Sequence, residues 1–410
     1  MKSLLKRKTK GIRSITLLLL VAMWCAACGS DEFNGQFPVK KTPPAPVTLL
    51  PDGVVNFPGG ATITYQLPDE TDLLYVKAVY QMPDGSVKEE KASVFSNTLT
   101  LRGFGRATTV KVQLITVDRS RNESSPVEVE IHPEESPIYN IFESLDVKEG
   151  WGGFTLQWNN PLKEKIVVQV LRLNDDVYEP IEAFYSEAAA IRQSVRGQPA
   201  VRADFGIYVR DVYNNYTDTL KLSMTPWYET RLDESKFVGI PLSTRFTISV
   251  NGTGDMTVLW DGITSANSLT GLYYINPWLY PPYIAINLGV KVKLSRFRIW
   301  SRSDYEFQLH HAKELQLYGT IEPMVGNNPE SQNTEWTQLS PESFISVRPS
   351  GLDVSVPATA EDIAYCREGE EWEVPLDAPV VQWVRIQQVS SWTGSYGLTF
   401  EEIRFWGAPQ

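Results

Sequence analysis

The feature that most constrains the fold of this chain is an internal repeat in its first half. Residues 59–68, GGATITYQLP, match residues 152–161, GGFTLQWNNP, at an offset of 93 residues. Anchors that share one offset without a gap indicate two copies of one module. We therefore predict two tandem domains, at residues 47–135 and 136–228. Two further pairs share the offset, Asp118 with Asp211 and Pro133 with Pro226.

Each copy has the residue pattern of a β domain. Within residues 61–65 and 154–158, apolar residues alternate with Thr or Gln. This is the period of a strand with one buried face. We therefore expect Tyr65 and Trp158, which close these strands, to lie in the core and not on a binding surface.

A turn at the end of a later strand completes the pattern of the module. Residues 118–124, DRSRNES, end such a strand in the first copy, and Asp211 starts its counterpart. We expect both aspartates to cap their turns; metal binding by these turns is the alternative. A strand ending in Tyr or Trp before a Pro, together with this turn, resembles the fibronectin type III family. The resemblance spans about 180 residues and implies immunoglobulin-like sandwiches of seven strands.

The first 27 residues have the features of a signal peptide. A basic segment precedes residues 15–27, an apolar run too short to span a bilayer. The run ends Cys25-Ala26-Ala27-Cys28, which resembles a lipobox, although Cys25 stands where Leu is usual. The resemblance implies a lipid on Cys28; an ordinary secretory signal is the alternative. The basic residues are Lys2, Lys6, Arg7, Lys8, Lys10 and Arg13.

Residues 28–46 are predicted to be a lipidated tether. They contain four prolines among polar residues, which favours an extended chain. Ser30-Asp31-Glu32 resembles the export signal of surface lipoproteins in Bacteroidota; a solvated acidic tether is the alternative. We therefore expect an anchor in the outer membrane, with the protein facing the cell exterior.

Charge and cysteine use agree with an exported protein. The whole chain has a net charge of −11, and loss of the basic signal segment makes it more acidic. A strongly acidic protein repels nucleic acid, so no nucleic-acid partner is expected. Apart from Cys25 and Cys28 the chain has only Cys366, which we expect to be buried and inert.

Residues 229–410 form the third predicted domain, again rich in strand patterns. Their order resembles the discoidin, or factor V/VIII type C, family, with Asn287 in place of its usual Asp. The resemblance implies a galactose-binding-like jelly roll, and the whole fold is then all-β. The elements that carry it are Asp261-Gly262, Ile286-Asn287-Leu288-Gly289, Arg298-Ile299-Trp300, Leu317-Tyr318-Gly319, Trp336, Val384-Arg385-Ile386 and the run from Glu402 to Gly407.

Members of that family bind sugars with loops at one end of the sandwich. Three segments are candidates here: 272–282, 301–305 and 390–397. Sugar rings stack on aromatic side chains, and their hydroxyls need planar donors and acceptors. The predicted ligand residues are Tyr274, Trp278, Tyr280, Arg302 and Trp392. The alternative is that the aromatic residues fold back and cap the end of the barrel.

The same resemblance implies a structural calcium site. Asp261 and Glu402 stand at the two matching positions, although residues 263–267 depart from the usual loop. Calcium takes six or more oxygen ligands, and the sequence indicates only these two side chains.

The sequence has none of the common catalytic motifs. It lacks a His-Glu-x-x-His zinc motif, a Gly-x-Ser-x-Gly elbow and a phosphate loop. His310 and His311 are adjacent, so on a strand they would point to opposite faces. We expect Glu370, Glu371 and Glu401 to lie at solvated edges.

The arrangement of domains resembles lipoproteins that accompany glycan-uptake systems. We therefore expect a non-catalytic surface protein that binds polysaccharide or oligosaccharide for an outer-membrane uptake system. One alternative is a scaffold or adhesin that binds a protein partner. A glycosidase with a concealed site is the other, and it would need two positioned carboxylates.

Overall fold

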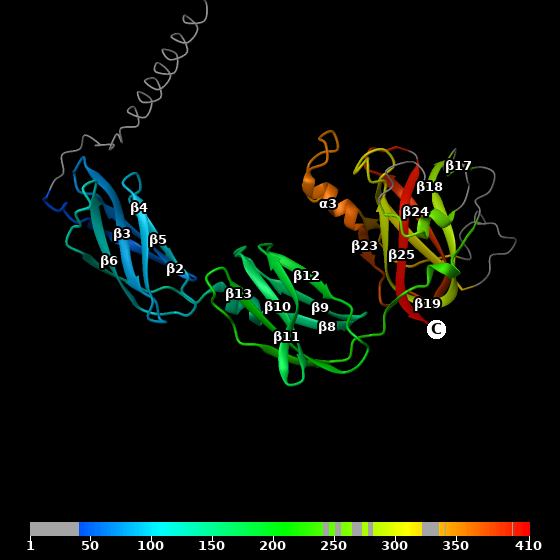
Figure 1. Cartoon of the computed structure of the whole chain (residues 1–410), viewed down its shortest axis with the longest axis horizontal. Coiled ribbons are helices and arrows are strands. Elements are labelled where there is room, and N and C mark those ends of the chain that lie inside the picture. The colour runs from blue at the N-terminus through cyan, green and yellow to red at the C-terminus, as the bar shows by residue number, and fades with distance from the viewer. Residues whose placement is uncertain are drawn as a thin grey trace, which may run out of the picture. The chain divides into compact units, whose positions relative to one another are not determined.

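The computed structural model of the chain is shown in Figure 1. It describes residues 41–240, 246–250, 256–264, 273–277, 282–321, 336–340, 342–395 and 397–410, with only the backbone described at 246–250 and 273–277. The described residues are mostly strands, so the predicted all-β fold is confirmed. None of their helices is long and apolar enough to cross a membrane. The predicted signal peptide and Cys28 lie outside the described residues.

The first sandwich consists of two antiparallel sheets, β1-β2-β5 and β4-β3-β6-β7. Its core includes Ile63, Tyr65 and Leu114, which are fully buried. The prediction for Tyr65 is therefore confirmed. The strands are β1 (Thr48–Phe57), β2 (Gly60–Gln66), β3 (Leu73–Gln81), β4 (Val87–Ser93), β5 (Thr98–Arg102), β6 (Val110–Asp118) and β7 (Val127–Ile131).

The second sandwich repeats this plan with sheets β12-β9-β8 and β11-β10-β13-β14. Strand β9 is the counterpart of β2, and its Trp158 is 2% exposed and packs near Phe184. The repeat in the sequence is thus a repeat in structure. The strands are β8 (Asp146–Gly150), β9 (Gly153–Asn159), β10 (Ile166–Asn174), β11 (Val177–Ser186), β12 (Ala190–Val195), β13 (Ala203–Asp211) and β14 (Leu220–Met224).

The two aspartates of the repeat cap their turns as predicted. The Asp118 carboxylate accepts hydrogen bonds from the backbone and side-chain nitrogens of Asn122, each at 2.9 Å. Asp211 accepts the same pair of bonds from Asn215. A helix that the strand patterns did not predict, α2 (Pro137–Glu143), precedes the second sandwich.

In its described residues, the C-terminal domain is built on one large sheet of 11 strands. Its principal path runs β17-β18-β25-β19-β24-β20-β21, and short strands pair along it. The elements are β15 (Thr230–Arg231), η1 (Glu234–Lys236), β16 (Val238–Gly239), β17 (Phe246–Val250), η2 (Met256–Trp260), β18 (Tyr273–Pro277), β19 (Tyr283–Ser301), β20 (Ala312–Thr320), β21 (Thr337–Gln338), β22 (Phe344–Ile345), α3 (Ala360–Glu368), β23 (Glu370–Glu373), β24 (Val381–Ser391) and β25 (Leu398–Pro409).

Strand β19 organises this domain. The sequence predicts two strands here, at residues 283–289 and 294–300. The structure has one strand, whose first part pairs with β24 and whose second part pairs with β25. The pairing with β24 shifts register between Asn287 and Val292. Gly289 lies in this bulge with φ +70, and a Cβ there would lie 2.6 Å from the Lys236 carbonyl oxygen, so glycine is needed. In the first part of β19, Ile284 and Ile286 fill the core, and after the register shifts Phe297 and Ile299 do so.

Helix α3 is an element of this domain that the strand patterns did not predict. Thr359 caps it, and Asp362 returns the hydrogen bond in a capping box. Asp362 is fully buried and forms an ion pair with Arg348 at 2.9 Å. Cys366, on the same helix, is a free and buried thiol, as predicted.

Candidate functional site

The strand register brings two of the predicted ligand segments, 301–305 and the described part of 390–397, to one end of the C-terminal domain. Ser301 pairs with Phe400, so the end of β19 lies beside the start of β25. Ala312 pairs with Ser391, which places the start of β20 beside the end of β24. Ile275 of β18 pairs with Leu398. Segments 301–311 and 391–395 therefore leave the sheet side by side.

These two loops are tied together by hydrogen bonds. The Thr393 hydroxyl donates to the Leu309 carbonyl at 2.5 Å, and the backbone N–H of Trp392 donates to the His311 carbonyl at 3.0 Å. His310 Nδ1 lies 3.0 Å from the Ser395 hydroxyl. The pair of loops therefore forms one surface, which we call the loop end (residues 301–311 and 391–395).

Arg302, Asp304 and Tyr305 form the polar and aromatic part of the loop end. Arg302 Nη2 donates to Asp304 Oδ2 at 2.8 Å, and its guanidinium lies 4.2 Å from the centre of the Tyr305 ring. The hydrogen bond from Arg302 lowers the pKa of Asp304, which stays charged. Tyr305 is 36% exposed. The cluster therefore offers a planar donor, a carboxylate acceptor and an aromatic ring at one place.

The buried carboxylate of Glu401 holds the loop of this cluster in place through Ser303. Glu401 is 0% exposed and accepts hydrogen bonds from the backbone N–H and the hydroxyl of Ser303, at 2.9 and 3.1 Å. The expectation that Glu401 lies at a solvated edge was wrong. The strand that carries it passes directly under the loop, and this contact fixes the turn that presents Arg302.

Glu370 is also buried, contrary to expectation. It is 4% exposed, and its Oε1 lies 2.8 Å from Nε2 of His311. His311 Nδ1 accepts a hydrogen bond from the Phe307 N–H, so Nε2 carries the proton and donates to Glu370. The ring of His311 also stacks on Phe307. This pair therefore supports the loop from inside the domain.

The two adjacent histidines do point to different neighbours, but they lie in a turn and not on a strand. His310 faces Ser395 across the loop end, while His311 faces the interior. Burial and the nearby Arg302 lower the pKa of His310. It is therefore neutral at neutral pH and offers ring nitrogens as hydrogen-bonding groups.

Trp392 is half-buried at the edge of the loop end. Its Nε1 donates to the Ser346 hydroxyl at 3.1 Å, its ring meets Phe307 edge to face, and Lys313 Nζ lies 5.1 Å from the ring centre. These contacts hold the indole in place. Its predicted role as a stacking platform stays a prediction.

Three of the other predicted ligand residues are not described in side-chain detail. Tyr274 lies on β18, paired with Thr399, but its side chain is outside the described part of the chain. Trp278 and Tyr280 lie outside the described residues altogether. Asp304, Tyr305 and His310 were not among the predicted ligand residues, although the candidate loop and the segment after it contain them. The signal for them was the polar and aromatic composition of 301–311.

The predicted calcium residues do come together, but the described groups do not fit a cation. Glu402 is fully buried; one of its oxygens accepts from the Gly262 N–H at 3.0 Å and the other from Arg404 Nε at 3.0 Å. Asp261 is exposed and caps the Ile263 N–H. Among the described residues, no cluster of three or more His, Cys, Asp or Glu could hold a metal. The Arg404 guanidinium supplies the positive charge beside Glu402 that a metal ion would otherwise supply.

Comparison with known proteins finds three matching families along the chain. Each is described as a domain of unknown function: DUF4959 at residues 44–133, DUF5126 at 134–235 and DUF5000 at 260–407. No curated protein matches the chain.

Similar solved structures include sandwich and jelly-roll proteins. A SusE-like protein is 25% identical, with 66% of this chain and 98% of that chain covered, at a TM-score of 0.41. A CBM32 module of a family 31 glycoside hydrolase from Clostridium perfringens is 15% identical, with 43% and 94% covered, at 0.28. A two-domain fibronectin type III segment of chicken tenascin is 13% identical, with 45% and 99% covered, at 0.21. At these TM-scores the similarities carry no inference about what this chain binds.

Proposed function

We propose that the chain is a non-catalytic surface lipoprotein that binds oligosaccharide or polysaccharide through the loop end of its C-terminal domain. The observation that supports this most is the cluster of Arg302, Asp304 and Tyr305 on one loop, which hydrogen bonds tie to the neighbouring loop 391–395. A guanidinium and a carboxylate match the vicinal hydroxyls of a sugar, and an aromatic ring matches its C–H face.

The loop end is also organised before any ligand arrives. Hydrogen bonds from Thr393 and His310 join the loops, and Glu401 holds the turn at Ser303. A preorganised site loses less conformational entropy on binding, so a few polar contacts suffice for specific recognition.

The geometry favours binding over glycoside hydrolysis. A glycosidase needs one carboxylic acid that keeps its proton and a second carboxylate facing it. Asp304 is the exposed acid of the cluster, and its pKa is lowered by Arg302, so it is a poor proton donor. The buried Glu401 is engaged by Ser303.

The cellular setting completes the proposal. A lipid on Cys28 would hold the protein at the outer membrane, and the acidic tether favours the exterior face. The two sandwiches would act as spacers, and the loop end would pass glycan to neighbouring uptake proteins. The proposal does not include a structural calcium ion at Asp261 and Glu402, because Gly262 and Arg404 already engage both oxygens of Glu402.

Isothermal titration calorimetry against a panel of plant, host and microbial glycans tests the binding site. The full chain with Cys25→Ser and Cys28→Ser is titrated, and then its variants Arg302→Ala and Tyr305→Ala. We expect saturable binding that weakens at least tenfold in each variant. Arg231→Ala is the matched control, because Arg231 forms a similar exposed ion pair with Glu234 beside the far end of β25.

The alternative of a protein partner has one observation in its favour. Several apolar side chains near Arg348 are exposed: Ile345 51%, Val347 60%, Leu352 42% and Val356 41%. Exposed apolar groups that lie together mark interaction sites. If the folded parent binds no glycan in the panel, this surface becomes the first candidate for a protein partner.

A further inference from the structure

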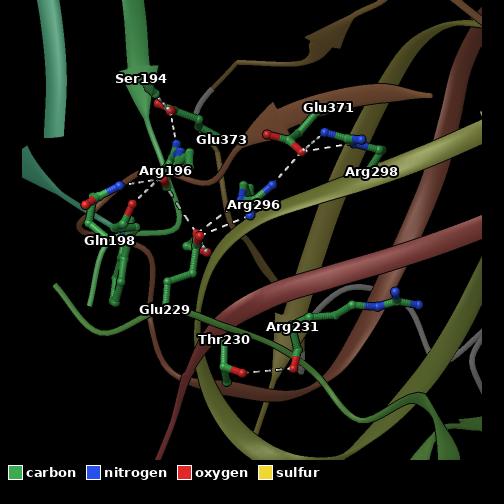
Figure 2. Close-up of polar contacts among 12 residues, drawn as sticks. Ser194, Arg196, Gln198, Glu229, Thr230, Arg231, Arg296, Arg298, Glu371 and Glu373 are labelled. Carbon is green, nitrogen blue, oxygen red and sulfur yellow. Dashed lines mark hydrogen bonds and ion pairs between the residues drawn. The ribbon is translucent and has the colours of Figure 1, made fainter. Parts of the chain in front are cut away.

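The second sandwich and the C-terminal domain meet at a cluster of charged side chains (Figure 2). Residues 140–210 and 217–410 belong to one compact unit. Within it, positive and negative side chains alternate along a series that begins in the second sandwich and ends in the C-terminal domain, and we call this series the ion ladder. Its members, in order, are Arg192, Glu373, Arg196, Glu229, Arg296, Glu371 and Arg298.

Glu229 is at the centre of the ion ladder. Its side chain is 4% exposed and comes directly after the second sandwich in the chain. It accepts hydrogen bonds from the Ser295 hydroxyl at 2.6 Å and from Nε and Nη2 of Arg296, both at 3.1 Å. Arg196 of the second sandwich lies 3.7 Å from the same carboxylate. Glu229 therefore contacts both domains.

A second contact between the domains is made by Glu373 of strand β23. Its carboxylate accepts from the Ser194 hydroxyl at 2.8 Å and forms ion pairs with Arg192 and Arg196. Arg196 is fixed in turn, because its Nη1 donates to the Trp151 carbonyl at 2.6 Å. Figure 2 shows Arg196 between Glu373 and Glu229.

On the side of the C-terminal domain the ion ladder rests on the sheet. Arg296 donates to Glu371 at 2.6 Å, and its guanidinium lies 4.1 Å from the centre of the Trp406 ring. Burial lowers the pKa of Arg296, but Glu229 and Glu371 outweigh this and raise it. The Arg296 guanidinium therefore remains charged.

The burial of the ion ladder determines how much its ion pairs contribute to holding the two domains in contact. Isolated surface ion pairs contribute little to stability, whereas removing one partner of a buried pair leaves an uncompensated charge. In the ion pairs that cross between the domains, the side chains of Glu229, Arg196 and Glu373 are 4%, 20% and 34% exposed. Separating the two domains would strip Glu229 of one arginine and leave Glu373 without Arg192 and Arg196. The domains are therefore favoured in contact.

We infer that the ion ladder holds the second sandwich and the C-terminal domain together as one rigid body, in one fixed relative orientation. Strand β23 connects the ion ladder with the loop end. Its Glu371 and Glu373 belong to the ladder, while the adjacent Glu370 holds His311. The orientation of the loop end relative to the second sandwich is then set by the ladder.

Double electron–electron resonance between spin labels tests this inference without any ligand. The labels are placed at Glu187→Cys and Asp377→Cys, two exposed positions in the two domains, in the full chain with Cys25→Ser and Cys28→Ser. Cys366 is buried, and burial raises the pKa of its thiol, so it stays unlabelled. We expect a single narrow distance distribution in the parent.

The ion ladder is then broken by Arg196→Gln together with Glu373→Gln. We expect the width of the distance distribution at least to double, while circular dichroism shows both domains still folded. Arg231→Gln removes an ion pair within the C-terminal domain and should leave the distribution narrow. A broad or bimodal distribution in the parent would overturn the inference. So would a narrow distribution in the double variant, because the domains would then be held by other contacts. Neither result depends on glycan binding.

Discussion

At the scale of single residues, the question is whether a metal ion or the Arg404 side chain neutralises the buried Glu402 carboxylate. Burial raises the pKa of Glu402, and hydrogen bonds from Gly262 and Arg404 offset part of that effect. We predict that Arg404→Met destabilises the C-terminal domain by roughly 1–3 kcal/mol, since it leaves a buried carboxylate less compensated. Thermal denaturation of the parent and of the Arg404→Met variant, each with EDTA and with excess calcium, is the measurement. Equal melting temperatures in the two buffers are expected for the parent; a higher one with calcium would favour the metal site.

Asp362 gives the domain an acid-sensitive contact. Burial alone would raise its pKa, but hydrogen bonds from Thr359, Ser350 and Arg348 outweigh this and hold it well below the ordinary value of 3.8. A lowered folded pKa contributes stability above the unfolded pKa, and that stability is lost as the pH falls through the folded pKa.

We therefore predict that the parent loses stability as the pH falls below about 4, where the carboxylate of the unfolded chain gains its proton. Asp362→Asn should be less stable at neutral pH and should show a shallower loss in acid. Urea denaturation midpoints across this range measure both effects. An identical slope in the variant would mean that other carboxylates dominate the acid response.

Individual residues differ in how far the sequence predicted them. Tyr65 and Trp158 were placed in the core by strand alternation, and Asp118 was placed as a turn cap by its neighbours. These signals are local. Glu370 and Glu401 were expected at solvated edges, because their partners are distant in sequence: His311 is 59 residues from Glu370, and Ser303 is 98 residues from Glu401. A pattern of neighbouring charges contains no information about such contacts.

At the scale of elements, the repeat predicts equivalent roles for equivalent strands. Trp158 on β9 is 2% exposed, while Gln157 beside it is exposed. We predict that Trp158→Ala lowers the stability of the second sandwich by about 3–5 kcal/mol, because it leaves a large cavity. Gln157→Ala should have little effect. Hydrogen exchange of peptides from β9 and β10 measures both, and similar protection in the two variants would contradict the prediction.

Two elements show where strand patterns fail. Residues 283–289 and 294–300 read as two separate strands, yet the bulge at Gly289 lets one strand, β19, pair with both β24 and β25. Helix α3 was missed, although Thr359 and Asp362 have the spacing of a capping box. Its residues pack through Arg348 and not through an apolar stripe, so the helical period in the sequence is weak.

At the scale of the whole molecule, the sequence predicts the modules better than their junction. Each module has its own hydrophobic pattern, so its fold class is readable from a local segment. The ion ladder joins residues from 192 to 373, and no single segment contains it. The relation between domains is therefore a property of charges that meet only after each module has folded.

The last prediction concerns how the whole protein is held at the cell surface. If Cys28 is acylated, two or more acyl chains give a stable membrane anchor, whereas an unlipidated chain without a membrane-spanning segment would be released. We predict that the parent incorporates an alkyne fatty acid during growth and enters the detergent phase on Triton X-114 partitioning.

Cys28→Ser should abolish both the labelling and the partitioning. Cys25→Ser is the matched control, because it changes a neighbouring thiol but leaves the acylated position intact, and it should behave like the parent. Labelling that persists in Cys28→Ser would show that the lipid is elsewhere. Loss of labelling with continued membrane association would mean that the protein is held by a partner and not by a lipid on Cys28.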